Sequence, residues 1–549
     1  TAAATATANN IPVLILPGDI YASRQPDPVL QQMEQPQNLS ISAHDAFQAV
    51  TKYWGRINRP EQVMTDMISA MRVLTDTANT GAVAISLPQD VQAEAYDYPV
   101  DFFKKRVWRI DRRPVTKYAL DKAVEVIKNA KKPLLICGGG VRYAEAHKVF
   151  KKFAEDFGIA FGETQAGKSA VVWDHELNLG GLGTTGGIAA NKLAHEADVV
   201  IGVGTRYTDF TTASKWLYRT DAKFVNINPS EFQAYKMDAT PVVADANEAL
   251  TAIGEELAKI GYHTDKAYAE EVAALRKEWW TEVERLDKVE YTDPEHFTPE
   301  CNDDNRECVE KYIEDTGCKL CQTTVLGTIN HMIDDNAIVC AAAGSLPGDM
   351  QGLWRARKEN TYHMEYGYSC MGYEVASALG AKIACPDQEV YAMCGDGSFD
   401  MLHSELITSV QMGHKINVML FDNASFGCIN NLEVSNGNAS ICTEKNMLEE
   451  GVTNGVHKGK VIQVDYAAIG AAYGCKTYTV KTLDELKAAI EDAKKQTVST
   501  LIDMKVLPKT MSAGYEAWWR VGVAEVSTKP EVQAARKAIE DHLFEARHY

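Results

Sequence analysis

The chain has 549 residues and a formal net charge of −19, from 75 acidic and 56 basic residues. This length is sufficient for about three domains that each bury a core. The acidic balance, without a basic cluster interleaved with aromatic residues, argues against nucleic acid as a partner. No apolar stretch approaches the roughly 20 residues that span a bilayer, so we expect no membrane partner. The 12 cysteines include several within apolar stretches, which is typical of a reducing cytoplasm rather than a disulfide scaffold.

Residues 1–105 are predicted to form part of an α/β domain. A small-residue helix end over 2–8 precedes a strand over 11–16, a proline-rich loop, amphipathic helices and a buried strand over 81–90. Because the chain begins within a helix, without an initiating Met or a signal-peptide pattern, we expect that an amino-terminal portion of this domain precedes Thr1. The basic segment 106–114 is predicted to be a solvated linker.

Residues 116–262 are predicted to form a second, central α/β domain. A helix over 119–130 precedes strands over 133–137, 199–203 and 224–227. Three glycines, Gly138 to Gly140, follow the first of these strands but lack the third spaced glycine of a dinucleotide-binding turn. We therefore expect this domain to hold no flavin, and we keep a flavin as the alternative.

Residues 263–321 are predicted to be a helical, acidic connector. It carries Cys301, Cys308, Cys318 and Cys321, of which the last two have a Cys-x-x-Cys spacing. The spacing of all four matches no zinc module, so incidental thiols are favoured over a structural zinc site.

Residues 322–506 are predicted to form a third α/β domain, followed by a tail over 507–549 that contains Trp518, Trp519 and a charged helix. Its strands are expected over 337–340, 390–394, 416–421 and 500–505, with one helix over 398–412. The fold class is therefore α/β, with three doubly wound parallel-sheet domains, of which the first is truncated at its amino end.

Two polar residues follow neighbouring strands of this third domain. Asp396 lies between Gly395 and Gly397 after one strand, and Asn423 follows the next. Open α/β sheets bind ligands at the carboxyl ends of their strands, and Mg²⁺ prefers carboxylate, amide and phosphate oxygens. The glycines allow close approach of the backbone, and helix amides face an anion. The pattern favours a site for a diphosphate and a metal ion.

Gly-Asp-Gly with an asparagine 27 residues after its aspartate resembles the cofactor motif of thiamine-diphosphate-dependent enzymes. The segments 341–349 and 369–374 extend the resemblance, which implies that the three domains are pyrimidine-binding, central and diphosphate-binding. It also implies that thiamine diphosphate and Mg²⁺ are the cofactors and that Met371 props the cofactor into a bent shape. The implied cofactor contacts are Gly344, Ser345, Leu346, Ser369, Met371, Gly395, Asp396, Gly397, Ser398, Asn423, Ser425, Phe426 and Gly427, with Asp396, Asn423 and a backbone carbonyl near Ser425 on the metal ion.

The segments 365–374, 401–406 and 426–432 are similar to one branch of this family, which hydrolyses trihydroxycyclohexane-1,2-dione to 5-deoxyglucuronate in myo-inositol breakdown. The resemblance implies hydrolytic opening of a cyclic 1,2-dione. In this family a glutamate of the pyrimidine domain activates the cofactor. By its position in the family's domain we expect that residue before Thr1. Glu34 and Glu61 are in polar surroundings and are poor substitutes.

Two histidines are candidate proton-handling residues. His403 follows the Gly-Asp-Gly motif, and His363 precedes the segment with Met371. Two alternatives remain open: a carboligase of acetolactate-synthase type, which a tightly bound flavin would favour, and a non-catalytic relative that only binds the cofactor. The resemblance also implies a homodimer or homotetramer with the active site at a subunit interface.

Overall fold

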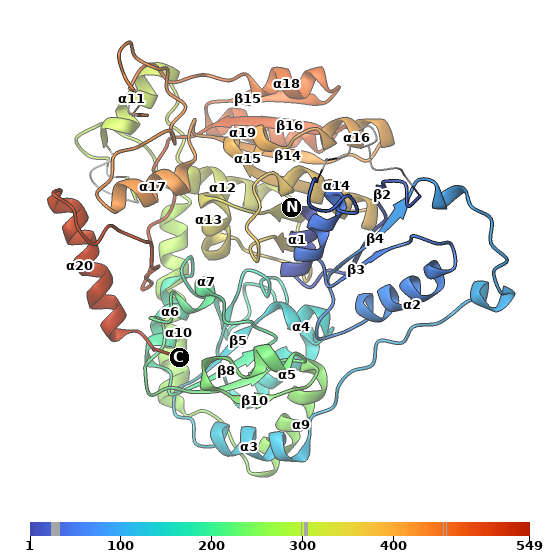
Figure 1. The fold of residues 1–549 in the computed structure, drawn as a ribbon. Coiled ribbons are helices and arrows are strands. Elements are labelled where there is room, and N and C mark those ends of the chain that lie inside the picture. Colours follow the sequence, from blue (N-terminus) through green and yellow to red (C-terminus); the bar gives the residue numbers. More distant parts are fainter. Residues whose placement is uncertain (24–32, 34, 298, 301–305, 454, 457) are drawn as a thin grey trace. The chain divides into compact units, whose positions relative to one another are not determined.

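A computed structural model describes the chain except for residues 24–32, 34, 298, 301–305, 454 and 457 (Figure 1). Glu34 and Cys301 therefore lie outside the described residues. The chain divides into two compact units. One contains residues 1–113, 229–231 and 367–370, and the other contains the remaining residues.

The first unit contains a small parallel sheet in which β4 pairs with β1, β2 and β3. Alternate residues of β4 pack on opposite faces, with Val83 and Ile85 against α2 and Ala82 against α1. Apart from Ser86 the strand is apolar, because both faces are covered. Its elements are α1 Ala2–Ala8, β1 Val13–Ile15, β2 Gly18–Asp19, a 3₁₀ turn Ala43–Ala49, β3 Tyr53–Arg56, α2 Gln62–Leu74 and β4 Ala82–Pro88.

The second unit contains two six-stranded parallel sheets. The central sheet has the order β10-β9-β8-β5-β6-β7. Leu134 and Ile136 of β5 face a core shared with α6 and α10, whereas Leu135 and Cys137 face α5 and α9. Its elements are α3 Lys117–Ile127, β5 Pro133–Cys137, α4 Gly139–Tyr143, α5 His147–Phe157, β6 Phe161–Glu163, β7 Asn178–Gly181, α6 Ile188–Glu196, β8 Val199–Val203, α7 Asp209–Thr212, β9 Lys223–Ile227, α8 Glu231–Ala234, β10 Thr240–Val242 and α9 Ala246–Lys259.

The third sheet has the order β12-β11-β13-β14-β16-β15 and is covered by helices on both faces. The predicted α/β fold with three parallel sheets is confirmed. The elements are α12 Gln322–Met332, β11 Ile338–Ala341, α13 Ser345–Leu353, β12 Tyr362–Met364, α14 Tyr373–Ala384, β13 Val390–Gly395, α15 Asp396–Met401, α16 Glu405–Met412, β14 Asn417–Asp422, α17 Gly427–Ser435, α18 Tyr466–Ala472, β15 Lys476–Val480, α19 Leu483–Ala493 and β16 Thr500–Lys505.

One predicted element is wrong. The single helix expected over 398–412 is two helices, α15 and α16, and the break falls at Leu402, whose φ of −159° and ψ of 104° are extended. Leu402 packs there against Gly372, where an added Cβ would lie 2.9 Å from the Leu402 Cβ. A contact with a residue 30 positions earlier cannot be read from helical periodicity.

The segment expected as a connector contributes to the core. It contains α10 Lys266–Leu286 and α11 Arg306–Thr316. Trp279 of α10 is 1% exposed and packs against Gly187 of the central domain and Gly352 of α13. The central and third sheets therefore share one continuous core, which is why they form one unit.

The tail packs on the central domain. It ends in α20 Pro530–Glu545. The Trp519 indole donates to Asp209 at 2.6 Å, and Trp518 stacks on His542 of α20. Over the described residues, no helix combines the length and the apolar character needed to cross a bilayer.

Candidate functional site

Asp396 and Asn423 lie at the same edge of the third sheet. Strand β13 ends at Gly395 and the adjacent parallel strand β14 ends at Asp422, with Gly395 opposite Phe421 in register. Asp396 is therefore the first residue after its strand, and Asn423 the first after the next. Both residues are buried, with Asp396 only 1% exposed. This is the edge at which open parallel sheets bind ligands.

Each of these side chains has a buried oxygen that could take a metal ion. Asn423 Oδ1 has no hydrogen-bond donor among the described residues, whereas Asp396 Oδ2 has an ion pair with Lys445 as its one polar contact there. A buried acceptor that lacks a hydrogen bond costs about 1–3 kcal/mol, more if it is charged. A hard divalent cation would satisfy both oxygens, because Mg²⁺ takes oxygen ligands from one or two side chains and from phosphates. The residues present therefore fit such an ion.

A lysine that the sequence did not reveal lies beside Asp396. Lys445 Nζ forms an ion pair with Asp396 Oδ2 at 2.8 Å. Lys445 also bonds to Asp400 and to the Tyr466 hydroxyl. Burial and the Asp422 carboxylate raise the pKa of Asp396 to about 7, against the influence of Lys445. Lys445 lies in a loop without a motif, so no sequence signal pointed to it.

Two helices begin beside Asn423. α13 begins at Ser345 and α17 at Gly427, and each has nine residues. A Cβ added at Gly427 would lie 3.2 Å from Asn423 Nδ2 and 3.7 Å from Ser345 Oγ, so the three residues are close together. Gly344, the N-cap of α13, has a φ of +106° and open space where a side chain would project. The backbone amides at two helix starts favour an anion here.

Gly397, the residue after Asp396, lies against Phe426 and Met371. A Cβ at Gly397 would lie 2.8 Å from the Phe426 ring and 3.3 Å from Met371 Cε. The Ser425 hydroxyl donates to the Thr443 carbonyl at 3.1 Å, which fixes the side chain and leaves its oxygen lone pairs and the backbone for a ligand. Of the other predicted contacts, Gly395, Ser398 and the buried Leu346 lie in or beside these elements, whereas Ser369 belongs to the first unit.

His363 does not lie with this group. It is on β12, the edge strand, opposite Cys340 of β11. Arg142 Nη2 donates to its Nδ1 at 3.1 Å, and its Nε2 contacts the Asn360 carbonyl at 3.1 Å. Burial and the Arg142 charge lower the pKa of His363 to about 4, so the imidazole is neutral at pH 7. These contacts join the third domain to the central one.

His403 lies in the break between α15 and α16, not within a helix. Its Nδ1 donates to the Phe399 carbonyl at 2.8 Å, and its ring stacks on Phe399 with centroids 4.7 Å apart. Tyr473 packs against the same ring. These contacts give His403 a packing role.

The glycine turn of the central domain is filled by protein. Cβ atoms added at Gly138 and Gly140 would lie 2.4 and 2.5 Å from backbone atoms of Gly204. The close approach of the two segments requires these glycines. Their presence is therefore explained without a ligand.

The three described cysteines of the connector differ in their contacts. Cys308 donates to Glu444, Cys318 contacts the Lys505 carbonyl, and Cys321 is buried. Within the described part of the chain, no cluster of three or more His, Cys, Asp or Glu side chains could hold a metal ion.

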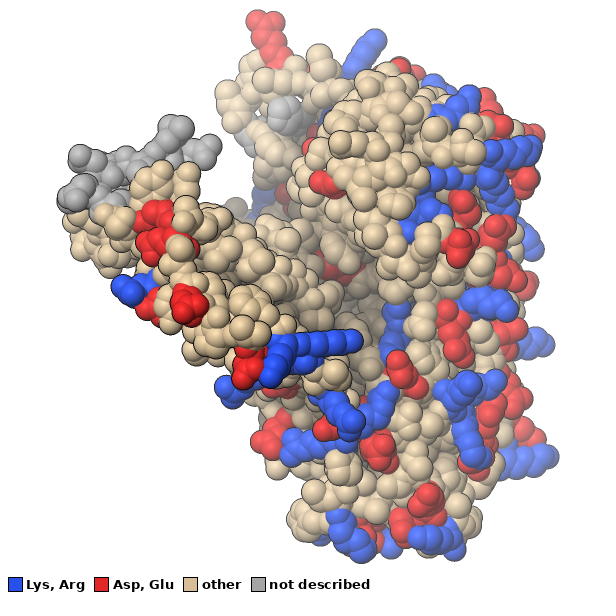
Figure 2. Space-filling view, turned by 90° about the vertical axis from the view of Figure 1, so that its right-hand side faces the viewer, with Lys and Arg blue, Asp and Glu red and all other residues tan. Residues whose placement is uncertain are grey.

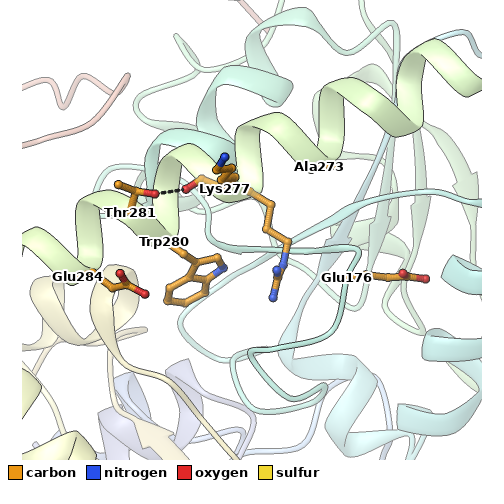
Figure 3. A pocket seen from close by; sticks show the side chains of 7 residues that line it. Glu176, Ala273, Lys277, Trp280, Thr281 and Glu284 are labelled. Carbon is orange, nitrogen blue, oxygen red and sulfur yellow. Dashed lines mark hydrogen bonds between the residues drawn. The ribbon is translucent and has the colours of Figure 1, made fainter.

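A surface pocket of about 360 Å³ lies along α10 (Figure 3). Acidic and basic side chains both line it, and none of its residues comes from the carboxyl edge of the third sheet. The pocket is therefore separate from the candidate site. It is lined by Glu176, Ala273, Arg276, Lys277, Trp280, Thr281 and Glu284.

Comparison with known proteins assigns the domains. Residues 120–253 match the family described as thiamine pyrophosphate enzyme, central domain, and residues 342–504 match the C-terminal TPP binding domain of such enzymes. The chain belongs to the thiamine-diphosphate-dependent enzymes. Asp396 and Asn423 lie within residues 342–504, the part of the chain that matches the TPP binding domain.

Three relatives of this chain share the name 3D-(3,5/4)-trihydroxycyclohexane-1,2-dione hydrolase. The Bacillus cereus protein is 59% identical over 550 aligned residues, which cover 100% of this chain and 85% of the relative. The Bacillus thuringiensis protein is 58% identical, and the Clostridium tetani protein is 57% identical, with the same coverage. The resemblance to this branch is confirmed.

Proposed function

We propose that the chain is a hydrolase that depends on thiamine diphosphate and Mg²⁺ and opens the ring of a cyclic 1,2-dione, trihydroxycyclohexane-1,2-dione, in myo-inositol breakdown. The observation that carries this proposal is the pair of buried oxygen ligands on Asp396 and Asn423 at one sheet edge, inside a domain that matches the TPP binding domain of thiamine pyrophosphate enzymes. The names of relatives that are 57–59% identical support the substrate.

The proposal assigns roles to the residues that the fold brings together. Asp396, Asn423 and the backbone at Ser425 would hold the metal ion. The amino ends of α13 and α17, with Gly344, Ser345 and Gly427, would face the diphosphate. Met371 and Phe426, which meet at Gly397, would pack against the organic part of the cofactor.

When bound, thiamine diphosphate supplies a nucleophilic carbon and then an electron sink for cleavage next to a carbonyl group. In the overall reaction one water is consumed and the bond between the two carbonyl carbons breaks. One carbon becomes a carboxylate and the other an aldehyde, so the product is an acyclic deoxyuronic acid. The protein's part is to orient the dione and to exclude other water. The acid–base roles of His403 and His363 stay predictions.

The test is an activity measurement with matched cofactor conditions. We expect purified full-length protein, treated with EDTA and then supplied with thiamine diphosphate, Mg²⁺ and the cyclic dione, to form the uronic acid. Omission of either cofactor should abolish product formation. Condensation of pyruvate, without ring opening, would instead identify a carboligase. Cofactor binding by calorimetry without turnover of either substrate would identify a non-catalytic relative.

We also propose that the chain forms a homodimer or homotetramer in the cytoplasm, with a small molecule rather than nucleic acid or membrane as its other partner. Exposed apolar side chains lie on α14, α15 and α16 and at the break between α15 and α16, and Figure 2 shows a broad uncharged area on the side where α16 lies in Figure 1. Such patches mark interfaces. They include Ile383, Met401, Leu402, Ile407 and Met412.

Light scattering after size-exclusion chromatography tests this surface. We expect the wild type to elute at twice or four times the chain mass. The double variant Ile407→Lys, Met412→Lys should shift it toward the monomer, because two charges would be buried at the contact. A monomeric wild type would contradict the proposal, and Ile441→Lys, which alters an exposed apolar residue outside these helices, serves as the control.

A further inference from the structure

Glu374 is a buried carboxylate that the proposed chemistry does not use. It is the second residue of α14 and is 1% exposed. Glutamate is almost never fully buried unless its charge is partnered, because removal of a carboxylate from water costs several kcal/mol. The partners of this carboxylate therefore indicate why it is present.

The partners come from three separate segments. The Gly372 N–H donates to Glu374 Oε2 at 3.0 Å. The Ala343 backbone and the Ser398 side chain also hydrogen bond to the carboxylate. Ala343 immediately precedes Gly344 and α13, Gly372 follows Met371, and Ser398 lies one residue after Gly397 in α15. One carboxylate thus joins the three segments that carry the proposed cofactor contacts.

This arrangement depends on a glycine at positive φ and on a carboxylate whose burial is costly. Gly372 has a φ of +89° and leads directly into α14, so its N–H points at Glu374 only in a conformation that favours glycine. Burial raises the pKa of Glu374 to about 7 although its hydrogen bonds oppose the shift. An apolar side chain would fill the same space without this cost, which argues for a role beyond packing.

We propose that Glu374 is a positioning residue that holds these three segments in register and thereby sets the affinity of the site for thiamine diphosphate. The inference rests on the proposed function and deepens it. It assigns Glu374 no direct contact with substrate or cofactor. Loss of the carboxylate frees three donors, so the segments separate and the cofactor must reorder them when it binds.

The experiment compares Glu374→Ala and Glu374→Gln with the wild type. Titration with thiamine diphosphate at saturating Mg²⁺ should give a Kd at least about tenfold higher for the alanine variant. The glutamine variant keeps an acceptor oxygen and should stay within about threefold of the wild type. At saturating cofactor, kcat of the alanine variant should return to within about twofold of the wild type, because only cofactor affinity has changed.

Hydrogen exchange of cofactor-free protein supplies a readout that needs no activity. In the alanine variant, amides of 343–346 and 396–400 should exchange faster, whereas the central sheet should be unchanged. Glu163→Gln alters another buried glutamate of the same unit, 2% exposed and 3.5 Å from Lys168, and should leave the cofactor Kd unchanged. If the alanine variant does not fold, Glu374→Asp, in which the carboxylate is one methylene shorter and withdrawn from its donors, should show the same faster exchange of 343–346 and 396–400, and exchange equal to the wild type would overturn the inference.

Equal Kd values and equal exchange in wild type and alanine variant would overturn the inference, as would a kcat that stays low at saturating cofactor. Failure of the wild type to bind thiamine diphosphate would instead overturn the proposed function. In that case the exchange measurement would still test whether Glu374 joins the three segments.

Discussion

The two six-stranded sheets of the second unit use glycine at their carboxyl edges for opposite purposes. In the central sheet, Gly138 and Gly140 follow β5 and are in contact with the backbone of Gly204 after β8. In the third sheet, a side chain at Gly344 would meet nothing within 4 Å, and the buried Asn423 Oδ1 accepts no hydrogen bond from the described residues. The same fold thus closes one edge with its own backbone and leaves the other ready for a ligand.

The largest expected effect on turnover comes from a substitution at the carboxyl edge of the third sheet. Asp396→Ala removes the only carboxylate among the proposed metal ligands, so we expect turnover to fall at least about 1,000-fold and Mg²⁺-dependent cofactor binding to disappear. Ring-opening assays and calorimetry measure these effects. The matched control is Asp400→Asn in the same helix, which shares Lys445 as a partner and should retain turnover within about tenfold. Unchanged turnover in Asp396→Ala would remove the metal site from the proposal.

One glycine-to-alanine substitution at each edge tests whether the two edges differ in function. Gly140→Ala places a Cβ 2.5 Å from Gly204 Cα and should destabilise folding by about 1–3 kcal/mol without change in the cofactor Kd. Gly344→Ala, with φ +106° and ψ −167°, should cost about 1–3 kcal/mol in backbone strain and also raise the Kd about tenfold. Urea unfolding and calorimetry separate the two effects. A raised Kd in Gly140→Ala would show that the central edge also affects the ligand.

A smaller effect is the pH dependence of folding stability that comes from His363, at the contact between the central and third domains. The pKa of His363 is lowered to about 4 from its usual value of 6.5, so between these pH values the unfolded chain binds more protons than the folded one. Stability should therefore rise with pH across this window, by at most about 3 kcal/mol, and be lost as pH falls through it. In His363→Gln this part of the slope should vanish. Urea unfolding at several pH values between 4 and 7 measures it, and an unaltered slope would contradict the assignment.

The smallest expected effect is that of His403→Asn, which separates the acid–base role predicted from the sequence from the packing seen in the structure. The stacking on Phe399 and the bond to its carbonyl should be lost, with a decrease in stability of about 1–2 kcal/mol. Turnover should stay within about threefold of the wild type. A decrease of 100-fold or more at an unchanged cofactor Kd would establish His403 as a proton-handling residue.

The sequence by itself determined the three parallel sheets and the positions of Asp396 and Asn423. Strands buried on both faces are continuous apolar runs, and the residues that follow them must lie at one edge, so β5, β8 and β16 were predicted with their observed bounds. Only the tertiary structure decided which side chains meet there.

Lys445 reaches Asp396 from a loop 49 residues away, Glu374 joins three segments, and Gly140 contacts Gly204. The helix break at Leu402 likewise follows from a contact with Gly372. Each contact depends on packing between distant segments, which local periodicity and motif spacing do not encode.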